Sequence, residues 1–276
     1  MNPKRLIALT ALCLLMAAGS APAEDVSSLV WERNLETAIS KARETNKPMI
    51  LDFWADWCGP CKVMEKEVYT DPNFISLSGK FVLVKIDFDR NAELARKYGI
   101  EAIPYLVFAN SHGTELMHQR GIINARTLTA VMGALPSDIS KLNELDRKLA
   151  GNKNDADALR QMGDHLMDAG LYTRSNDYYA RALKVVKSGP YREEMLVNLG
   201  NNALALQQGP EAAKAFETAV KEYPSSRKIA ELRLGLAKSY VLAEKNDKAR
   251  KAAEELIRSH PETAEAEQAR KIIDSR

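Results

Sequence analysis

Cys58 and Cys61 are three positions apart, and this spacing places two thiols one helical turn apart. Residues 48–54, just before them, form a short apolar run typical of a buried strand, and residues 62–68 follow with a helical pattern. The thiols are therefore expected at a strand-to-helix junction, where the helix dipole and unpaired backbone N–H groups stabilise an anion. We predict that Cys58, in the first helical turn, is the attacking thiolate and that Cys61 resolves the mixed disulfide.

Gly59 and Pro60 suit this turn, because glycine permits a tight turn and proline in the first helical turn removes no intrahelical hydrogen bond. Two other interpretations of the pair stay open. A zinc site is disfavoured because Cys13 is the only other cysteine and the four histidines show no paired ligand spacing. A structural disulfide across so short a loop would constrain the unfolded chain very little. We therefore expect redox chemistry without a metal or another cofactor.

Several motifs in the first half of the chain recur in the order known from one family. They are Asp52-Phe53-Trp54-Ala55-Asp56-Trp57, Cys58-Gly59-Pro60-Cys61, Lys85-Ile86-Asp87, Tyr98-Gly99-Ile100, Ile103-Pro104 and Gly121. These motifs and their order make residues 28 to about 136 resemble thioredoxin. The resemblance implies a thioredoxin fold for residues 24–137, with a mixed central sheet flanked by helices. It also implies a thiol–disulfide oxidoreductase of the protein-disulfide reductase type.

The same resemblance implies roles for single residues. It implies a redox-active disulfide between Cys58 and Cys61, and a buried carboxylate, Asp52, behind Cys61 with Lys85 on the neighbouring strand as its partner. Burial raises the pKa of a carboxylate, so Asp52 is expected to take the proton of Cys61, through water, when that thiol is activated. A structural hydrogen-bonding role for Asp52 stays open.

The implied substrate surface surrounds the cysteines. A cis peptide bond before Pro104 is expected to face the thiols, with the preceding backbone open to an extended substrate segment. The implied substrate-binding residues are Trp57, Gly59, Pro60, Ile103, Pro104 and Tyr105. Tyr105 stands where thioredoxin has threonine, which changes the surface that a substrate meets.

Two features depart from thioredoxin. Lys66 replaces the proline that kinks the active-site helix, so this helix is expected to run smoothly through residues 64–67. Residues 61–72 are more similar to the thioredoxin-like C-terminal domain of the periplasmic DsbD reductant carriers.

The elements that position these residues follow from hydrophobic periodicity and turn signals. Strands are predicted over residues 29–31, 48–54, 81–88, 105–108 and 115–118, and helices over residues 35–44, 62–68, 91–98 and 127–135. Residues 110–113, Asn-Ser-His-Gly, predict a hairpin between the last two strands. Trp31 is expected in the core.

Residues 1–23 have the pattern of a cleaved secretory signal. Two basic residues precede an apolar run over residues 6–18, and Ala21-Pro22-Ala23 follows. A lipoprotein signal is the competing interpretation, but Cys13 lies inside the apolar run. Cleavage would leave a periplasmic chain that is not an integral membrane protein.

The charge of the cleaved chain would be balanced. Cleavage removes two of the 39 Lys and Arg residues and none of the 37 acidic residues, so 37 positive charges face 37 negative ones. Such a chain lacks the basic surplus typical of nucleic-acid binding, and no nucleic-acid partner is expected.

Beyond Pro136 the composition changes to Ala, Leu, Lys, Glu and Arg with helical spacing. Residues that match 37 positions apart are Gly163 and Gly200, Tyr179 and Phe216, Ala182 and Ala219, and Pro224 and Pro261. This half resembles the tetratricopeptide repeat, in which paired helices approach closely at small residues. A third repeat is degenerate, because Ala253 occupies its aromatic position.

The repeat resemblance implies an all-α solenoid over residues 155–276, joined by a connecting helix and linker over residues 138–154. The expected helix pairs are 155–169 with 172–187, 191–207 with 209–222, and 226–242 with 246–259, followed by a capping helix at 262–274.

These features together predict a periplasmic thiol–disulfide oxidoreductase that reduces the disulfides of client proteins. A reductant in that compartment needs electrons from across the inner membrane, so an inner-membrane electron carrier is an expected partner. The solenoid is expected to lie beside the active site and to dock a peptide or protein on its concave surface. A stabilising or dimerising role of the solenoid stays open. The alternative function is a chaperone or assembly adaptor, in which the repeats bind clients and the thiols are secondary.

Overall fold

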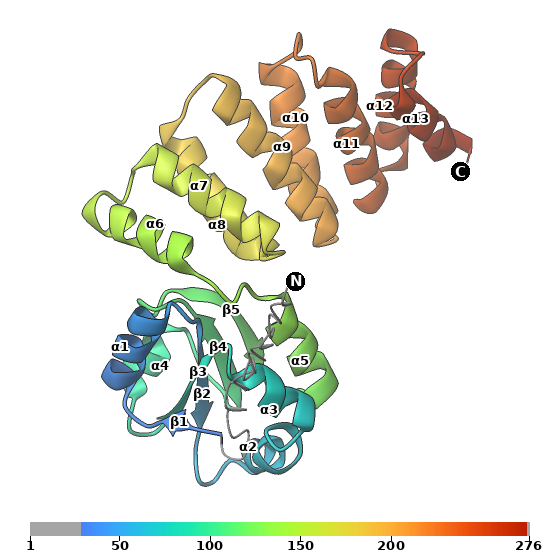
Figure 1. The fold of residues 1–276 in the computed structure, drawn as a ribbon. Helices are drawn as coiled ribbons and strands as arrows, with labels where there is room; N and C mark the ends of the chain where they lie inside the picture. The colour runs from blue at the N-terminus through green and yellow to red at the C-terminus, as the bar shows by residue number, and fades with distance from the viewer. Residues whose placement is uncertain (1–28, 275–276) are drawn as a thin grey trace, which may run out of the picture.

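The structure is a computed structural model that describes residues 29–274. The predicted signal peptide and Cys13 lie outside the described residues. Figure 1 shows an α/β half that holds the sheet and, above it, an array of paired helices. The predicted fold class, an α/β fold followed by an all-α solenoid, is confirmed. Among the described residues, no helix combines the length and the apolar character that a membrane crossing requires.

The α/β half is built on a mixed sheet with the strand order β1-β3-β2-β4-β5. The strands are β1 (Trp31–Glu32), β2 (Met49–Trp54), β3 (Val82–Asp87), β4 (Tyr105–Ala109) and β5 (Glu115–Arg120). β2 pairs in parallel with β3 and antiparallel with β4. Because both faces of the sheet are covered, β2 and β3 are buried along most of their length and consist of apolar residues. Asp52 and Lys85 are the buried exceptions.

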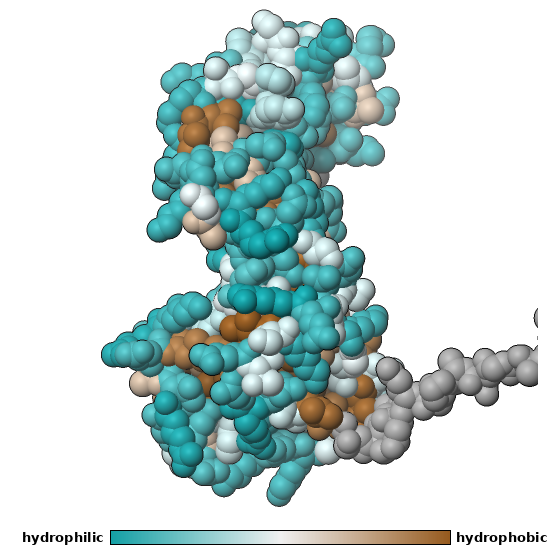
Figure 2. Space-filling model, turned by 60° about the vertical axis from the view of Figure 1, so that its left-hand side comes forward, coloured by the Kyte–Doolittle hydropathy of each residue, from teal (hydrophilic) through white to brown (hydrophobic). Residues whose placement is uncertain are grey.

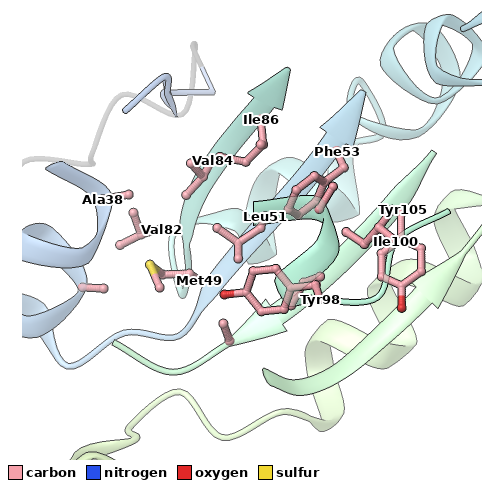
Figure 3. Close-up of a cluster of buried hydrophobic side chains, with 14 residues drawn as sticks. Ala38, Met49, Leu51, Phe53, Val82, Val84, Ile86, Tyr98, Ile100 and Tyr105 are labelled. Atoms are coloured by element: carbon pink, nitrogen blue, oxygen red, sulfur yellow. The ribbon is translucent and has the colours of Figure 1, made fainter. Parts of the chain in front are cut away.

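Helical segments cover the two faces of this sheet. They are α1 (Leu35–Thr45), α2 (Gly59–Val63), η1 (Met64–Val68), α3 (Pro72–Ser78), α4 (Ala92–Lys97) and α5 (Ala125–Ala134). On one face, Leu51 and Phe53 of β2 pack in a cluster with Ala38 of α1 (Figure 3). On the other face, Ile50 lies in a cluster with Phe74 of α3 and Leu128 of α5.

Side-chain caps explain where these helices begin. Asn34 and Asn124 accept backbone N–H groups at the starts of α1 and α5. Asp71 caps α3 in the same way, and Pro72 is its first residue. α3 was not predicted, because a helix of seven residues is too short for its apolar period to stand out.

The helical half contains the predicted pairs. They are α7 (Ala156–Asp168) with α8 (Tyr172–Val185), α9 (Pro190–Ala205) with α10 (Gly209–Glu222), and α11 (Ile229–Leu242) with α12 (Asn246–Ser259), followed by α13 (Ala264–Asp274). In these pairs an aromatic ring packs directly against a glycine of a neighbouring helix, which explains why glycine and an aromatic residue recur 37 positions apart. A Cβ on Gly163 would lie 2.5 Å from the Tyr179 ring, and one on Gly200 or Gly235 would lie 2.6 Å from the Phe216 ring.

α6 (Ser140–Gly151) lies in the predicted connecting segment and contacts both halves of the chain. Leu142 and Leu145 share an apolar cluster with Leu116 of β5 and with residues of α7 and α8. Asp146 accepts hydrogen bonds from Asn110 Nδ2 at 2.8 Å and from Thr114 Oγ1 at 2.5 Å, both in the β4–β5 hairpin. α6 therefore packs against the sheet of the α/β half and against the first helix pair of the repeats.

The repeats join the sheet at the end opposite the cysteines. Ala109, next to the hairpin, pairs with Met49 at the start of β2, whereas the cysteines follow the end of β2 at Trp54. After β5, α5 carries the chain back, and the backbone N–H of Ile139 donates to the carbonyl of Asn46, just before β2. Figure 1 places α2 and α6 at opposite ends of the α/β half. The expectation that the solenoid lies beside the active site is therefore wrong.

Candidate active site

Cys58 and Cys61 lie at the start of α2, joined by a disulfide bond. Cys58 is the N-cap residue of α2, and the backbone N–H of Cys61 donates to Cys58 Sγ at 3.1 Å. The disulfide that the resemblance implied is thus present, at the predicted strand-to-helix junction. In a reduced protein, the same N–H and the helix N-terminus would favour negative charge on the sulfur of Cys58.

The active-site helix continues beyond α2 in a different form from the one predicted. Residues Met64–Val68 form the π-helix η1, and the backbone N–H of Tyr69 donates to the carbonyl of Met64 at 3.0 Å. The prediction of a smooth helix through residues 64–67 is therefore wrong. A π turn aligns residues five apart, so Met64, Val68 and Tyr69 are all buried on the sheet side. Lys66 is exposed.

A buried ion pair lies on the strands that lead to this helix. Asp52 of β2 is directly opposite Lys85 of β3 in the sheet register, and Lys85 Nζ lies 2.8 Å from Asp52 Oδ2. Both side chains are less than 5% exposed. Burial raises the pKa of the Asp52 carboxyl, and the neighbouring Lys85 charge opposes part of this rise. The predicted burial of Asp52 and its partner Lys85 are confirmed, whereas their catalytic roles stay predictions.

Three aromatic rings surround Lys85, a feature that the sequence analysis missed. Lys85 Nζ lies 4.9 Å from the ring centroid of Trp31, 5.6 Å from that of Trp54 and 4.8 Å from that of Tyr69. Cation–π attraction adds to the ion pair and helps to keep a charged lysine inside the protein. Trp31 was expected in the core, and it is partly buried against this cluster.

Glu65 is the second carboxylate near this lysine. Its Oε1 lies 3.9 Å from Lys85 Nζ, and its side chain is 59% exposed. The helical spacing of four residues from Cys61 was a possible signal for Glu65. Tyr69 had no such signal, because only the π turn brings a residue five positions after Met64 to the same side.

The aromatic neighbour of the cysteines is open to solvent. The Trp57 side chain is 66% exposed, and its Nε1 donates to Asp89 Oδ2 at 2.9 Å. This hydrogen bond ties the exposed indole ring of the residue before Cys58 to Asp89. Gly59 and Pro60 are exposed at the start of α2.

The predicted cis peptide bond is present between Ile103 and Pro104. Both residues line a hollow of about 320 Å³, together with Tyr105 and Arg120. The Tyr105 ring is only 3% exposed, because it stacks on His118 with 5.2 Å between ring centroids and the Arg120 guanidinium lies 5.9 Å from its centroid. In the hollow next to the cis bond, a substrate would therefore meet the exposed Arg120 more than the buried Tyr105.

Comparisons with known proteins agree with this geometry. A family model described as a thioredoxin-like domain matches residues 35–136, and two tetratricopeptide-repeat models match residues 160–227, 197–243 and 231–263. Thioredoxin from Griffithsia pacifica is 30% identical over 105 residues, which are 38% of this chain and 82% of that protein.

Two other relatives are longer proteins, of which the match covers less than a third. The thiol:disulfide interchange protein DsbD from Vibrio vulnificus is 34% identical over 106 residues, which are 37% of this chain and 17% of DsbD. The thioredoxin-related protein DsbJ from Chlamydia pneumoniae is 29% identical over 110 residues, which are 35% of this chain and 32% of DsbJ.

A disulfide at a helix N-terminus on this sheet defines a thiol–disulfide oxidoreductase. The chain belongs to the thioredoxin family through its first half and carries tetratricopeptide repeats in its second half.

Proposed function

We propose that the chain is a periplasmic reductase of client-protein disulfides, with Cys58 as the attacking thiol and Cys61 as the resolving thiol. The observation that carries the proposal is the Cys58–Cys61 disulfide at the N-terminus of α2, with the buried Asp52–Lys85 pair on the strands behind it. The N-terminal sequence pattern supports the periplasmic location. In this proposal the chain consists of a signal peptide at 1–23, a thioredoxin-like domain at 24–137, a connecting helix and linker at 138–154, and repeats at 155–276.

The reaction transfers two electrons to the client. The Cys58 thiolate attacks one sulfur of a client disulfide, and the other client sulfur leaves as a thiolate and takes up a proton. Asp52 accepts the proton of Cys61, whose sulfur then attacks Cys58 Sγ and releases the second client sulfur. The client ends as a dithiol and the protein as the Cys58–Cys61 disulfide. An electron carrier in the inner membrane then returns the protein to its dithiol form.

Cys61→Ser in the full chain tests this assignment. Without the resolving thiol, the mixed disulfide between Cys58 and a client should accumulate and should separate again when a reductant is added. Cys58→Ser is the matched control and should trap nothing. Equal trapping by both variants, or trapping by Cys58→Ser alone, would show that the two roles are assigned wrongly. Mass spectrometry of the trapped species identifies the clients.

A second candidate function, the adaptor, rests on an apolar groove in the repeats. The groove has a volume of about 520 Å³ and is lined by residues of α8, α9 and α10, including Ala180, Leu196 and Leu199. Figure 2 shows apolar patches on both halves of an otherwise hydrophilic surface. If the chain is an adaptor, Ala180→Arg, which puts a charge at the groove, should abolish client binding, and Cys58→Ser should leave it intact. If the chain is a reductase, Cys58→Ser should abolish the reduction of client disulfides, and Ala180→Arg should leave it intact.

A further inference from the structure

Tyr69 carries a buried hydroxyl group that makes no hydrogen bond within the described part of the chain. The residue is 3% exposed. A buried hydroxyl without a partner costs free energy, so such groups are rare in native proteins and call for an explanation. The proposed reaction, as described above, does not use this group.

Packing fixes the Tyr69 ring in one place. The ring centroid lies 5.0 Å from that of Trp31 and 5.1 Å from that of Phe74. Lys85 Nζ lies 4.8 Å from the same ring. The π-helix η1 places Tyr69 on the side that faces the sheet, because the backbone N–H of Tyr69 donates to the Met64 carbonyl in the last turn of η1. The hydroxyl therefore has little freedom to find a partner elsewhere.

Tyr69 and the Asp52 carboxyl lie on the same ammonium group, because Lys85 Nζ is 4.8 Å from the Tyr69 ring centroid and 2.8 Å from Asp52 Oδ2. Burial, and then the negative charge of Asp52, raise the pKa of Tyr69 well above its usual value. The phenol thus keeps its proton at every working pH and can act as a donor toward a charged carboxylate. The charged and titratable groups that face Asp52 are Lys85 from β3, Glu65 from η1 and Tyr69 after η1.

We propose that Tyr69 is a positioning residue for the resolving step: when Asp52 becomes charged, the unpartnered Tyr69 hydroxyl closes to hydrogen-bond distance and donates to this carboxylate, beside Lys85, and so tunes proton transfer from Cys61. This inference rests on the proposed role of Asp52 as the proton acceptor. A donor to the charged form stabilises that form, so removal of the donor should make Asp52 hold its proton up to a higher pH.

Tyr69→Phe in the full chain removes the hydroxyl and keeps the ring. We expect the pH profile of mixed-disulfide resolution, followed by stopped-flow, to shift to higher pH. On its acid limb the rate should fall about threefold to tenfold, the factor that corresponds to one hydrogen bond. Tyr98→Phe is the matched control, because the Tyr98 hydroxyl is also buried but donates to the Gly113 carbonyl at 2.7 Å. It should leave the profile unchanged.

Two further measurements separate the possible failures. Tyr69→Phe should have no effect in an Asp52→Asn background, because the two residues act through one contact. A carbon-13 NMR titration of the Asp52 carboxyl in the oxidised protein should shift to higher pH in Tyr69→Phe, whatever the kinetics show. An unshifted titration, or an effect that persists in Asp52→Asn, would overturn the inference. If Asp52→Asn alone leaves resolution unchanged, the proposed role of Asp52 fails first.

Discussion

Asp146→Ala tests whether α6 holds the two halves of the chain together. The carboxylate is 16% exposed and accepts hydrogen bonds from Asn110 Nδ2 at 2.8 Å and Thr114 Oγ1 at 2.5 Å. Asn110 is only 1% exposed, so water replaces its lost partner poorly. A hydrogen bond to a charged group contributes about 1.5 to 3 kcal/mol, and partial exposure of Asp146 places the pair at the low end. We expect the free energy of unfolding to fall by about 2 to 4 kcal/mol.

Urea denaturation and hydrogen exchange measure this effect. Exchange of the hairpin amides of residues 110–114 should accelerate in Asp146→Ala, whereas insulin reduction should not change, because the hairpin lies at the end of the sheet opposite the cysteines. The matched control is Asp177→Ala, which removes an exposed carboxylate paired with Arg174 and should change stability by less than about 0.5 kcal/mol. A loss below about 1 kcal/mol with unchanged hairpin exchange would refute the reasoning.

Three other predictions concern the repeats, the thiols and the buried carboxyl. Phe216→Ala should destabilise the repeats by about 3 to 5 kcal/mol in denaturation, because the ring is 1% exposed between Gly200 and Gly235, and insulin reduction should persist. In alkylation of the reduced protein across pH, Cys58 should react faster than Cys61 near neutral pH, and faster reaction of Cys61 would reverse their roles. Because burial raises the pKa of Asp52 from 3.8, the native state binds this proton more tightly than the unfolded state. The free energy of unfolding should therefore fall as pH rises from 3.8 to the raised pKa. Denaturation at several pH values should show that Asp52→Asn lacks this part of the pH dependence.

Local patterns in the sequence were sufficient for most of the fold. The period of 37 residues located the paired helices, because each repeat must place a small residue such as Gly200 against an aromatic ring such as Phe216. The resemblance to thioredoxin, and not a local pattern, located Asp52 and Lys85, which face each other across β2 and β3.

The features that sequence analysis missed depend on contacts between distant segments. The π turn at Met64–Val68 buries Tyr69 together with its neighbours, and no local pattern separates it from an ordinary helix. The contact of Asp146 with Asn110 joins residues 36 positions apart in the sequence. Neither polar residue belongs to a repeated motif, so only the folded chain reveals the pair.

The position of the repeats constrains how they could assist the redox reaction. They contact the sheet at the hairpin beside Met49, whereas the dithiol follows Trp54 at the other end of β2. Six residues of strand span roughly 20 Å, at about 3.3 Å per residue. A client held by the repeats can raise its local concentration at Cys58 only if it spans this distance. The architecture therefore favours long or extended clients, and a compact client would have to reach the cysteines without help from the repeats.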